Sequence, residues 1–372
     1  MAAIQKYLEY SDIRDVVFVM GAGTSHPDGV PLQRHLLPLI LSGEIPEIGK
    51  SKIGKQVIGF IKDNFFYNQN SSFDPQLEAV FGFLDYFIQQ NESLNAKYTT
   101  ANLRIIKEHL IKLIHYVVDE RTNQKSKYYH LFWEAVKQYN PNISIITLNY
   151  DTLLEQAFEE FFRTFGYIDY CLHFMNYEKS ADLKQFNYWI NPREPVSVGE
   201  HETPVPLKII KLHGSLNWKY CNCCNQTLLT TWDRKIDLNK GKFLGYTYPD
   251  KKEYEYVCPQ DGTEFETLIL PPSYMKALTH PVISQLTCEA SREIRITKRL
   301  VFIGYSLSDA DLHIKALFKK QLRKNVEVIV VNDRIPETLK ARFLAISSNV
   351  QFITKSFERL VQSKALMKNL LS

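Results

Sequence analysis

The chain has 372 residues, of which 45% are hydrophobic and 23% charged, and its formal net charge is +4 at pH 7. This size allows one large α/β domain with insertions or two smaller domains. The weak positive charge argues against direct nucleic-acid binding, and the lack of both an 18-residue apolar stretch and a secretory leader predicts a cytoplasmic protein without membrane spans.

Short apolar runs that end in small or polar residues recur along the chain. The first covers residues 16–20, which read VVFVM and lead directly into Gly21-Ala22-Gly23-Thr24-Ser25. A continuous apolar run is typical of a strand that is covered on both faces. Pro31 suits the first turn of a helix, which we expect at residues 32–41.

Residues 42–140 have a mostly helical pattern. Apolar side chains recur at helical spacing in residues 77–88 and 103–118. The Asn- and Ser-rich stretches 64–72 and 89–95 indicate loops. We therefore predict a helical insertion at 42–140, after the first strand–helix unit.

The α/β pattern then resumes, and it predicts one Rossmann-like, doubly wound parallel sheet within a single domain over residues 1–372. In such sheets ligands bind beyond the carboxyl ends of the strands, which share one edge. Residues 165–205 look irregular. The further strands are expected at 143–148, 207–212, 300–303 and 326–331, and the further helices at 152–162, 309–322, 335–344 and 357–371.

Polar segments that follow these strands are expected to meet at that edge. The glycines of Gly21–Ser25 let the backbone approach a pyrophosphate, although a simple tight turn is the alternative. The segment lacks the third glycine and the downstream acid of a dehydrogenase fingerprint, which disfavours hydride transfer. Asn149 and Asp151 could hold a ribose and an amide, or Asp151 could cap the next helix. His213, next to Gly214, suits a general base, and a buried core histidine is the alternative.

A small cysteine-containing module is expected at residues 219–265. In a reducing compartment its clustered cysteines favour a metal site over disulfides. The second half of this degenerate zinc-ribbon-like pattern has Asp where a fourth Cys is expected, so either that Asp or Cys223 would complete a structural Zn²⁺ site. The alternative is a relic held by packing alone. The expected ligands are Cys221, Cys224, Cys258 and Asp261.

Together these segments resemble the sirtuin family, and within it the prokaryotic sirtuin-like NAD⁺ hydrolases of anti-phage defence. The resemblance rests on the order of the motifs over residues 16–332. They are Gly21-Ala22-Gly23-Thr24-Ser25 with Gly29-Val30-Pro31, Thr147-x-Asn149-x-Asp151, Lys211-Leu212-His213-Gly214-Ser215, Gly304-Tyr305-Ser306-Leu307-Ser308-Asp309, and Asn332.

The resemblance implies NAD⁺ as the substrate and a role for each site residue. Asn149 would bind the nicotinamide-side ribose or orient water, Asp151 would hold the carboxamide, and His213 would be the general base. The phosphates would contact Ala22, Gly23 and Ser25, and the adenosine half Ser306 and Asn332. The full set implied for binding NAD⁺ is Gly21, Ala22, Gly23, Thr24, Ser25, Gly304, Ser306 and Asn332.

The chain departs from deacylating sirtuins in the half of the site that would bind acyl-lysine. Leu32-Gln33-Arg34 stands where those enzymes have Asp-Phe-Arg, residues 270–275 replace a Phe-Gly-Glu segment, and Leu148 replaces a Gln. The NAD⁺ half of the pattern is kept. The resemblance therefore implies hydrolysis of NAD⁺ to ADP-ribose and nicotinamide.

By the same resemblance the protein would be a toxic effector of antiviral defence that acts by abortive infection. Such an enzyme would be controlled through a homo-oligomer or a partner such as a HerA-like ATPase. Two alternatives remain open at this stage. One is an NAD⁺-dependent protein deacylase or ADP-ribosyltransferase, and the other is a non-catalytic nucleotide-binding subunit of a defence complex.

Overall fold

A computed structural model gives the fold of most of the chain. Most of the predicted loop at 64–72 and much of the stretch 165–205 lie outside the part that it describes. None of the described helices has the length and apolar character that a membrane span requires. The described residues are 4–65, 75–122, 124–162, 164–175, 195–199, 203–230, 236–246, 250, 252–274 and 278–372.

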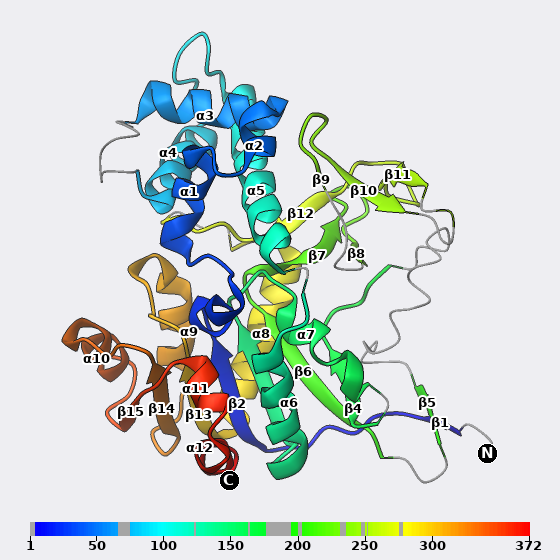
Figure 1. Ribbon diagram of the computed structural model, residues 1–372, viewed down its shortest axis with the longest axis vertical. Helices are drawn as coiled ribbons and strands as arrows, with labels where there is room; N and C mark the ends of the chain where they lie inside the picture. The colour runs from blue at the N-terminus through cyan, green and yellow to red at the C-terminus, as the bar shows by residue number, and fades with distance from the viewer. Residues whose placement is uncertain are drawn as a thin grey trace.

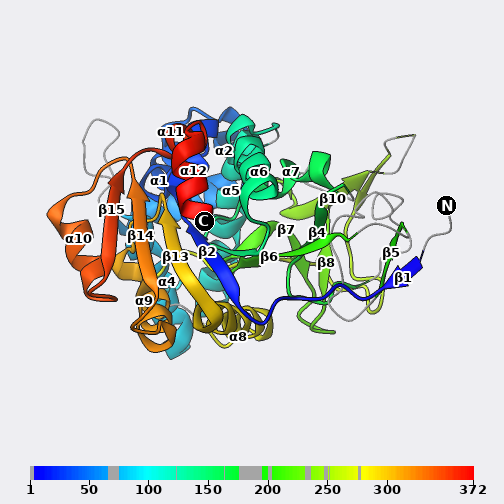
Figure 2. The same cartoon turned by 90° about the horizontal axis from the view of Figure 1, so that it is seen from below.

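A seven-stranded, fully parallel sheet forms the centre of the molecule, in the order β15-β14-β13-β2-β3-β6-β4 (Figures 1 and 2). The prediction of a doubly wound parallel sheet is confirmed. The strands are β2 (Arg14–Met20), β3 (Ile143–Thr147), β4 (Gly166–Asp169), β6 (Val205–Lys211), β13 (Thr297–Ile303), β14 (Glu327–Asn332) and β15 (Val350–Thr354).

Five of these strands were predicted, and the two edge strands β4 and β15 were not. Strand β4 is only four residues long and lies in the stretch that looked irregular. It pairs with β6 so closely that a Cβ at Gly166 would lie 2.2 Å from the carbonyl oxygen of Val205. Strand β15 has only partly buried and exposed residues, and it lacks the continuous apolar run of the central strands.

Helices cover both faces of the sheet, as Figure 2 shows with α6, α11 and α12 on one side and α8 and α9 on the other. Aromatic contacts fix both layers. The ring of Phe18 in β2 packs 5.2 Å from Phe132 of α6, centroid to centroid, and Phe302 of β13 packs 4.9 Å from Phe318 of α9. These strands are therefore buried on both faces, which explains their unbroken apolar sequences.

The described α-helices lie where a helix or a helical pattern was predicted, except for the unpredicted α8, and several differ in extent. They are α1 (Gln33–Ser42), α2 (Pro46–Lys50), α3 (Lys52–Asn64), α4 (Leu77–Gln90), α5 (Thr100–Thr122), α6 (Lys127–Tyr139), α7 (Leu153–Gln156), α8 (Pro281–Ile296), α9 (Leu312–Gln321), α10 (Glu337–Leu344), α11 (Phe357–Val361) and α12 (Lys364–Leu371).

Two predicted helices were too long. The helix expected at 152–162 ends after four residues and continues as the 3₁₀ turn Glu159–Phe161, because Phe158 turns inward to pack 4.8 Å from the Trp133 ring. The helix expected at 357–371 is divided into α11 and α12. Ser363 begins the second one, and its hydroxyl accepts the backbone N–H of Leu366 at 3.4 Å.

The helices between β2 and β3 fall into two groups. Helices α2 to α5 lie together beyond one end of the sheet, at the top of Figure 1, whereas α6 packs directly on the sheet through Phe132. The division of the chain into a catalytic domain with a helical insertion at 42–140 stays a prediction.

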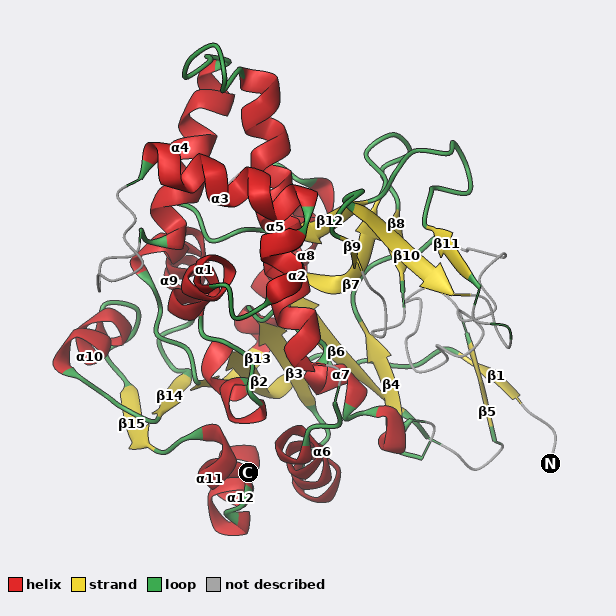
Figure 3. Cartoon of the chain, turned by 45° about the horizontal axis from the view of Figure 1, so that its top comes forward, coloured by secondary structure: helices red, strands yellow, loops and turns green. Residues whose placement is uncertain are grey.

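Small antiparallel sheets extend the molecule beside the main sheet (Figure 3). One has the order β12-β7-β8 and another β11-β10-β9, and a two-stranded sheet pairs β1 with β5. Their strands are β1 (Ile4–Lys6), β5 (Val196–Val198), β7 (Gly214–Tyr220), β8 (Thr227–Leu229), β9 (Ile236–Asp237), β10 (Lys242–Tyr246), β11 (Glu253–Glu255) and β12 (Glu266–Ile269).

Candidate functional site

Five neighbouring strands of the main sheet reach their carboxyl ends at the same level. The register pairs Val331 with Ile303, Ile303 with Met20, Met20 with Thr147, and Thr147 with Lys211. These five residues form one row across the sheet. Whatever follows each of them in sequence therefore starts at the same edge.

The polar segments that the sequence singled out begin one or two residues beyond this row. Asn332, Gly304 and Gly21 follow it directly, and Asn149 and His213 come two residues after it. The expected convergence of distant segments on one edge is thus present in the structure. The roles assigned to the individual side chains are proposals, and the contacts below supply their physical basis.

The glycine-rich turn after β2 lies against the turn after β13. The N–H of Gly23 donates to the carbonyl oxygen of Gly304 at 2.9 Å. A Cβ at Gly304, whose φ is +60°, would lie 2.7 Å from the backbone of Gly23. A side chain there would be strained and would also push the two turns apart. Glycine is therefore required for this close approach.

Asn149 ties the end of β3 to the same glycine-rich turn. Its Nδ2 lies 3.1 Å from the carbonyl oxygen of Gly21, 3.0 Å from Thr24 Oγ1 and 3.1 Å from Ser25 Oγ. The residue is 8% exposed, and Thr24 and Ser25 are fully buried. An amide NH₂ has two donors, so these three acceptors share them and fix the orientation of the side chain.

Tyr129 of α6 completes this network, and it was not predicted as a site residue. Its hydroxyl donates to Thr24 Oγ1 at 2.7 Å and lies 2.9 Å from Ser25 Oγ. Burial raises the pKa of Tyr129 well above its ordinary value, so the hydroxyl stays protonated. In sequence Tyr129 looks like any aromatic residue on the buried face of an amphipathic helix.

Asp151 is buried and contacts the start of the following helix. Its Oδ1 accepts the backbone N–H of Leu153 at 3.2 Å, which is the capping contact considered as the alternative role. Burial raises its pKa above the ordinary value, although the Lys211 charge and a hydrogen bond from Ser25 act to lower it. Lys211 itself donates to the Asp151 carbonyl oxygen at 2.6 Å and pairs with the buried Glu155 at 2.7 Å.

His213 stands at the junction of β6 and the small antiparallel sheet. Its carbonyl oxygen accepts the N–H of Leu270 at 2.9 Å. The next residue, Gly214, has φ +80°, and a Cβ there would lie 1.9 Å from the carbonyl oxygen of Leu268. The histidine backbone is therefore held firmly at the edge, and the His213 side chain is 6% exposed.

The imidazole of His213 faces two residues that sequence reasoning missed. Its Nε2 lies 3.2 Å from Nε2 of His313 and 3.8 Å from Oδ1 of Asp311, and the two rings stack with centroids 5.3 Å apart. Both residues follow the Gly304 turn at the start of α9. An Asp-x-His pattern just beyond a predicted strand end is the signal that could have identified them.

The residues expected at the adenosine half lie at the edge but outside the Asn149 network. Asn332 Nδ2 lies 3.5 Å from the Tyr305 carbonyl oxygen, and its Oδ1 accepts the N–H of Asp333 at 3.0 Å. Ser306 is exposed. Of the expected binding residues, Gly21, Ala22, Gly23, Thr24, Ser25 and Gly304 are directly connected to one another or to Asn149, and Ser306 and Asn332 are not.

The predicted metal ligands Cys221, Cys224, Cys258 and Asp261 come together in the small module, and their ligand atoms all lie within 4.8 Å of one another. The Sγ atoms of Cys224 and Cys258 are 3.7 Å apart, and Cys221 Sγ lies 3.4 Å from Asp261 Oδ2. In a tetrahedral zinc site with Zn–S near 2.3 Å and Zn–O near 2.0 Å, such pairs are about 3.8 and 3.5 Å apart. The four residues therefore fit a structural Zn²⁺ ion, and the exposed Cys223 is not needed for it.

The chain is a doubly wound α/β protein, and the polar segments described above lie at the carboxyl ends of five of its parallel strands. Residues 143–353 match the model of the SIR2-like domain. This match covers more than half of the chain, so the protein belongs to the SIR2-like domain family. The match includes Asn149, His213, the cysteine cluster and Asn332, and it begins after the glycine-rich turn.

Solved structures of Sir2 proteins resemble the chain over nearly its whole length at low sequence identity. A Sir2 homologue–NAD complex is 13% identical with a TM-score of 0.45, covering 99% of this chain and 96% of its own. Sir2Tm bound to a propionylated peptide is 14% identical with a TM-score of 0.43, covering 97% and 95%. No curated protein gives a significant sequence match.

Proposed function

We propose that the chain binds NAD⁺ at the carboxyl edge of the sheet and hydrolyses its N-glycosidic bond to give ADP-ribose and nicotinamide. The observation that carries the proposal is the register of β3 and β6. It places Asn149 and His213 at the same distance beyond the paired residues Thr147 and Lys211. Membership of the SIR2-like family supports NAD⁺ as the substrate.

The chemistry needs little more than these two side chains and the glycine-rich turn. The nicotinamide of NAD⁺ leaves as a neutral ring, so no general acid is required, and the barrier lies in forming an oxocarbenium-like ribose. Asn149, held by Thr24 and Ser25, would orient the ribose or the attacking water. His213 would accept the proton of that water as its oxygen bonds to the anomeric carbon. The proton then passes to solvent.

Turnover of NAD⁺ by purified protein tests the proposal. We expect Asn149→Ala and His213→Ala each to lower nicotinamide release by about 10²–10⁴-fold, the usual contribution of a positioned acid–base group. His130→Ala is the matched control, because His130 lies partly exposed on α6, where its side chain contacts Glu134 and Glu160 at 3.6 Å and packs 5.1 Å from the Phe161 ring, centroid to centroid. Full hydrolysis in both site variants would exclude the assigned roles.

The deacylase alternative is tested in the same assay by adding an acyl-lysine peptide. Consumption of NAD⁺ only when the peptide is present would favour a deacylase over a hydrolase. The substitutions around Leu32-Gln33-Arg34 and at Leu148 argue against that outcome, since these positions depart from the deacylase pattern.

A role as an antiviral effector forms part of the proposal because uncontrolled loss of NAD⁺ kills a cell. Such an enzyme has to stay inactive until it is triggered. We expect control by self-association or by a separate sensor such as a HerA-like ATPase. Size-exclusion chromatography that gives a fully active strict monomer would argue against this scheme.

A further inference from the structure

The side chains around His213 form a second group of metal-type donor atoms, separate from the cysteine cluster. One ligand atom each of His213, Asp311 and His313 can be chosen so that all three lie within 4.8 Å of one another. They come from the end of β6, from the 3₁₀ turn Asp309–Asp311 and from the first turn of α9. Hydrolysis as proposed above uses only the first of these side chains.

The spacing of the donor atoms is close to that of a metal site. His213 Nε2 lies 3.2 Å from His313 Nε2 and 3.8 Å from Asp311 Oδ1. Ligands about 2.0–2.1 Å from a tetrahedral zinc ion are about 3.3–3.4 Å apart. These two separations are therefore close to the spacing around one ion, and the third pair of ligand atoms lies within 4.8 Å.

Neighbouring groups hold Asp311 and His213 in place by hydrogen bonds, as the second coordination shell of a metal site does. Asp311 and His213 are 7% and 6% exposed. The Tyr305 hydroxyl donates to Asp311 Oδ2 at 3.0 Å, so the other oxygen, Oδ1, is the one that faces the imidazole of His213. The Leu270 N–H anchors the histidine backbone. Hydrogen bonds of this kind orient metal ligands and are part of the site.

We propose that His213, Asp311 and His313 bind a divalent first-row transition-metal ion, for which Zn²⁺ is the probe. Two imidazoles and one carboxylate are suitable ligands for such ions, and three protein ligands leave a coordination position open. The ion takes the lone pair on Nε2 of His213. A bound metal and acceptance of a proton by that atom therefore exclude one another, and only this inhibitory consequence rests on the proposed function.

Cobalt substitution separates the two metal sites because their ligands differ. Co²⁺ bound by cysteine thiolates gives a thiolate-to-metal charge-transfer band, which Co²⁺ bound by histidine and aspartate does not. We expect the full-length protein to bind a second equivalent of Co²⁺ that adds d–d absorption without charge transfer. Cys258→Ser should weaken the first signal and leave the second unchanged.

Variants of the new ligands then test the assignment. His313→Ala and His313→Gln should each abolish the second equivalent while the charge-transfer band persists, and thermal melts check that both variants are folded. Tyr305→Phe should weaken Co²⁺ binding at the second site by about 10–100-fold, because it removes a hydrogen-bond partner of the ligand Asp311. His130→Ala is again the matched control.

Either of two outcomes overturns the metal site. If cobalt binding to the second site is absent, or is the same in His313→Gln as in the unchanged protein, the two histidines are only a hydrogen-bonded pair. Inhibition of NAD⁺ turnover by Zn²⁺, relieved by a chelator and lost in His313→Gln, tests the consequence for catalysis. Without any turnover the spectroscopic titration still decides the binding, so failure of one proposal is distinguishable from failure of the other.

Discussion

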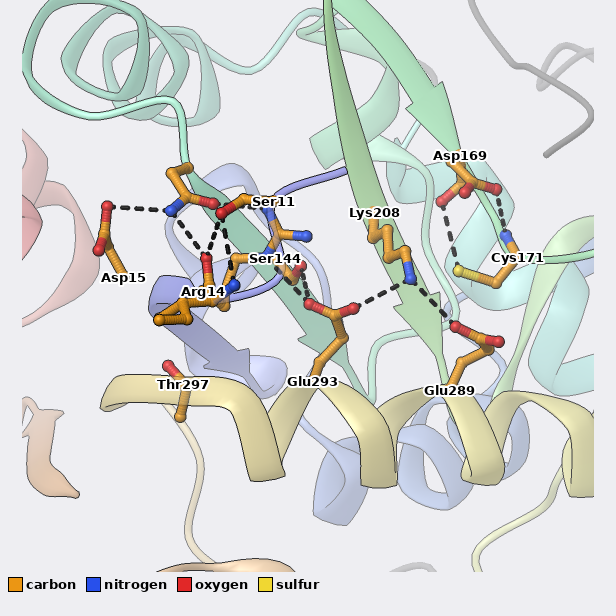
Figure 4. A network of polar contacts seen from close by, with 12 residues as sticks. Ser11, Arg14, Asp15, Ser144, Asp169, Cys171, Lys208, Glu289, Glu293 and Thr297 are labelled. Atoms are coloured by element: carbon orange, nitrogen blue, oxygen red, sulfur yellow. Dashed lines mark hydrogen bonds and ion pairs between the residues drawn. The ribbon is translucent and has the colours of Figure 1, made fainter. Parts of the chain in front are cut away.

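Two buried polar regions lie toward opposite ends of the central strands and are built from different groups. At the carboxyl edge the Asn149 amide contacts the hydroxyls of Thr24 and Ser25, and the Tyr129 hydroxyl contacts both of these. Toward the amino-terminal ends, Glu293 of α8 forms ion pairs with Arg14 and Lys208. Figure 4 shows Glu293 directed toward the strands.

In the region around Glu293, the buried cations Arg14 and Lys208 both form ion pairs with the Glu293 carboxylate. Its two carboxylate oxygens contact Arg14 Nε at 3.0 Å, Ser144 Oγ at 2.6 Å and Lys208 Nζ at 3.0 Å, and Lys208 also contacts Glu289 at 3.1 Å (Figure 4). The comparison teaches that burial of polar groups has two uses here. Closed ion pairing fastens α8 to the sheet, whereas the neutral groups around Asn149 hold the glycine-rich turn against the end of β3.

The largest effect on stability is expected from Glu293→Ala. Its removal leaves the buried charges of Arg14 and Lys208 with one partner fewer, and breaking a buried pair in this way costs about 3–5 kcal/mol of unfolding free energy. Glu289→Ala is the matched control, since Glu289 lies on the same helix and bonds the same lysine but is 30% exposed, so about 0–1 kcal/mol is expected. Urea unfolding measures both.

The same network gives a pH dependence with a definite sign. Burial acts to raise the pKa of Glu293, but Arg14 and Lys208 outweigh it and hold the pKa below the ordinary value of 4.5. The unfolded state therefore binds more protons in this range, and the contribution to stability is present above pH 4.5 and lost as the pH falls through the lower, folded value. The stability gap between the unchanged protein and Glu293→Gln should shrink there. A gap that stayed constant down to pH 3 would contradict this account.

A second prediction concerns Lys219, a buried cation that is placed differently from Lys208. Its Nζ donates to the Leu216 carbonyl oxygen and lies 4.0 Å from the centre of the Phe243 ring. Burial lowers its pKa from 10.5 to about 7, with the Asp119 charge acting the other way. A shift of this size corresponds to at most about 5 kcal/mol against folding at neutral pH. We expect Lys219→Met to stabilise the protein by about 1–4 kcal/mol.

The sign of the pH effect distinguishes this explanation from simple repacking. Between pH 7 and 10.5 the unfolded chain keeps the proton on Lys219 and the folded chain does not. Stability of the unchanged protein should therefore rise with pH across that window, and the rise should be smaller in Lys219→Met. Equal slopes in thermal melts of the two proteins would show that Lys219 stays charged when folded.

The sequence predicted the part of the site that depends on strand ends. Continuous apolar runs identified β2, β3 and β6, and the residues just after them are the ones that meet at the edge, including Asn149 and His213. This worked because parallel strands that are buried on both faces carry their signal in the local sequence. The ligands of the cysteine module were also predicted from local sequence, since they come in two short motifs.

The parts that were missed depend on how helices pack. Tyr129 and His313 lie on helices, where an aromatic or a histidine has the same local pattern whether it faces the core or a site. Which role each has is decided by the placement of α6 and α9 on the sheet. Local sequence does not contain that information for Tyr129, and for His313 the Asp-x-His pattern after a strand end was the one available signal. The polar contacts of Glu293 were invisible too, because they join an acid on a helix to bases on two strands.

The smallest expected effect concerns Tyr129, which links α6 to the neutral network at the edge. Tyr129→Phe keeps the buried ring, including its contact with Phe357 at 5.0 Å, and removes the hydroxyl between Thr24 and Ser25. Loss of one buried hydrogen-bonding group costs about 1–3 kcal/mol. Because the two hydroxyls also hold the Asn149 amide, we expect NAD⁺ turnover to fall by about tenfold, through a lower kcat. Tyr128→Phe, on the same helix but only partly buried, is the control. If turnover fell equally in both variants, helix packing and not the hydroxyl would position Asn149, and the contrast between the ion-paired region around Glu293 and the neutral region around Asn149 would not hold.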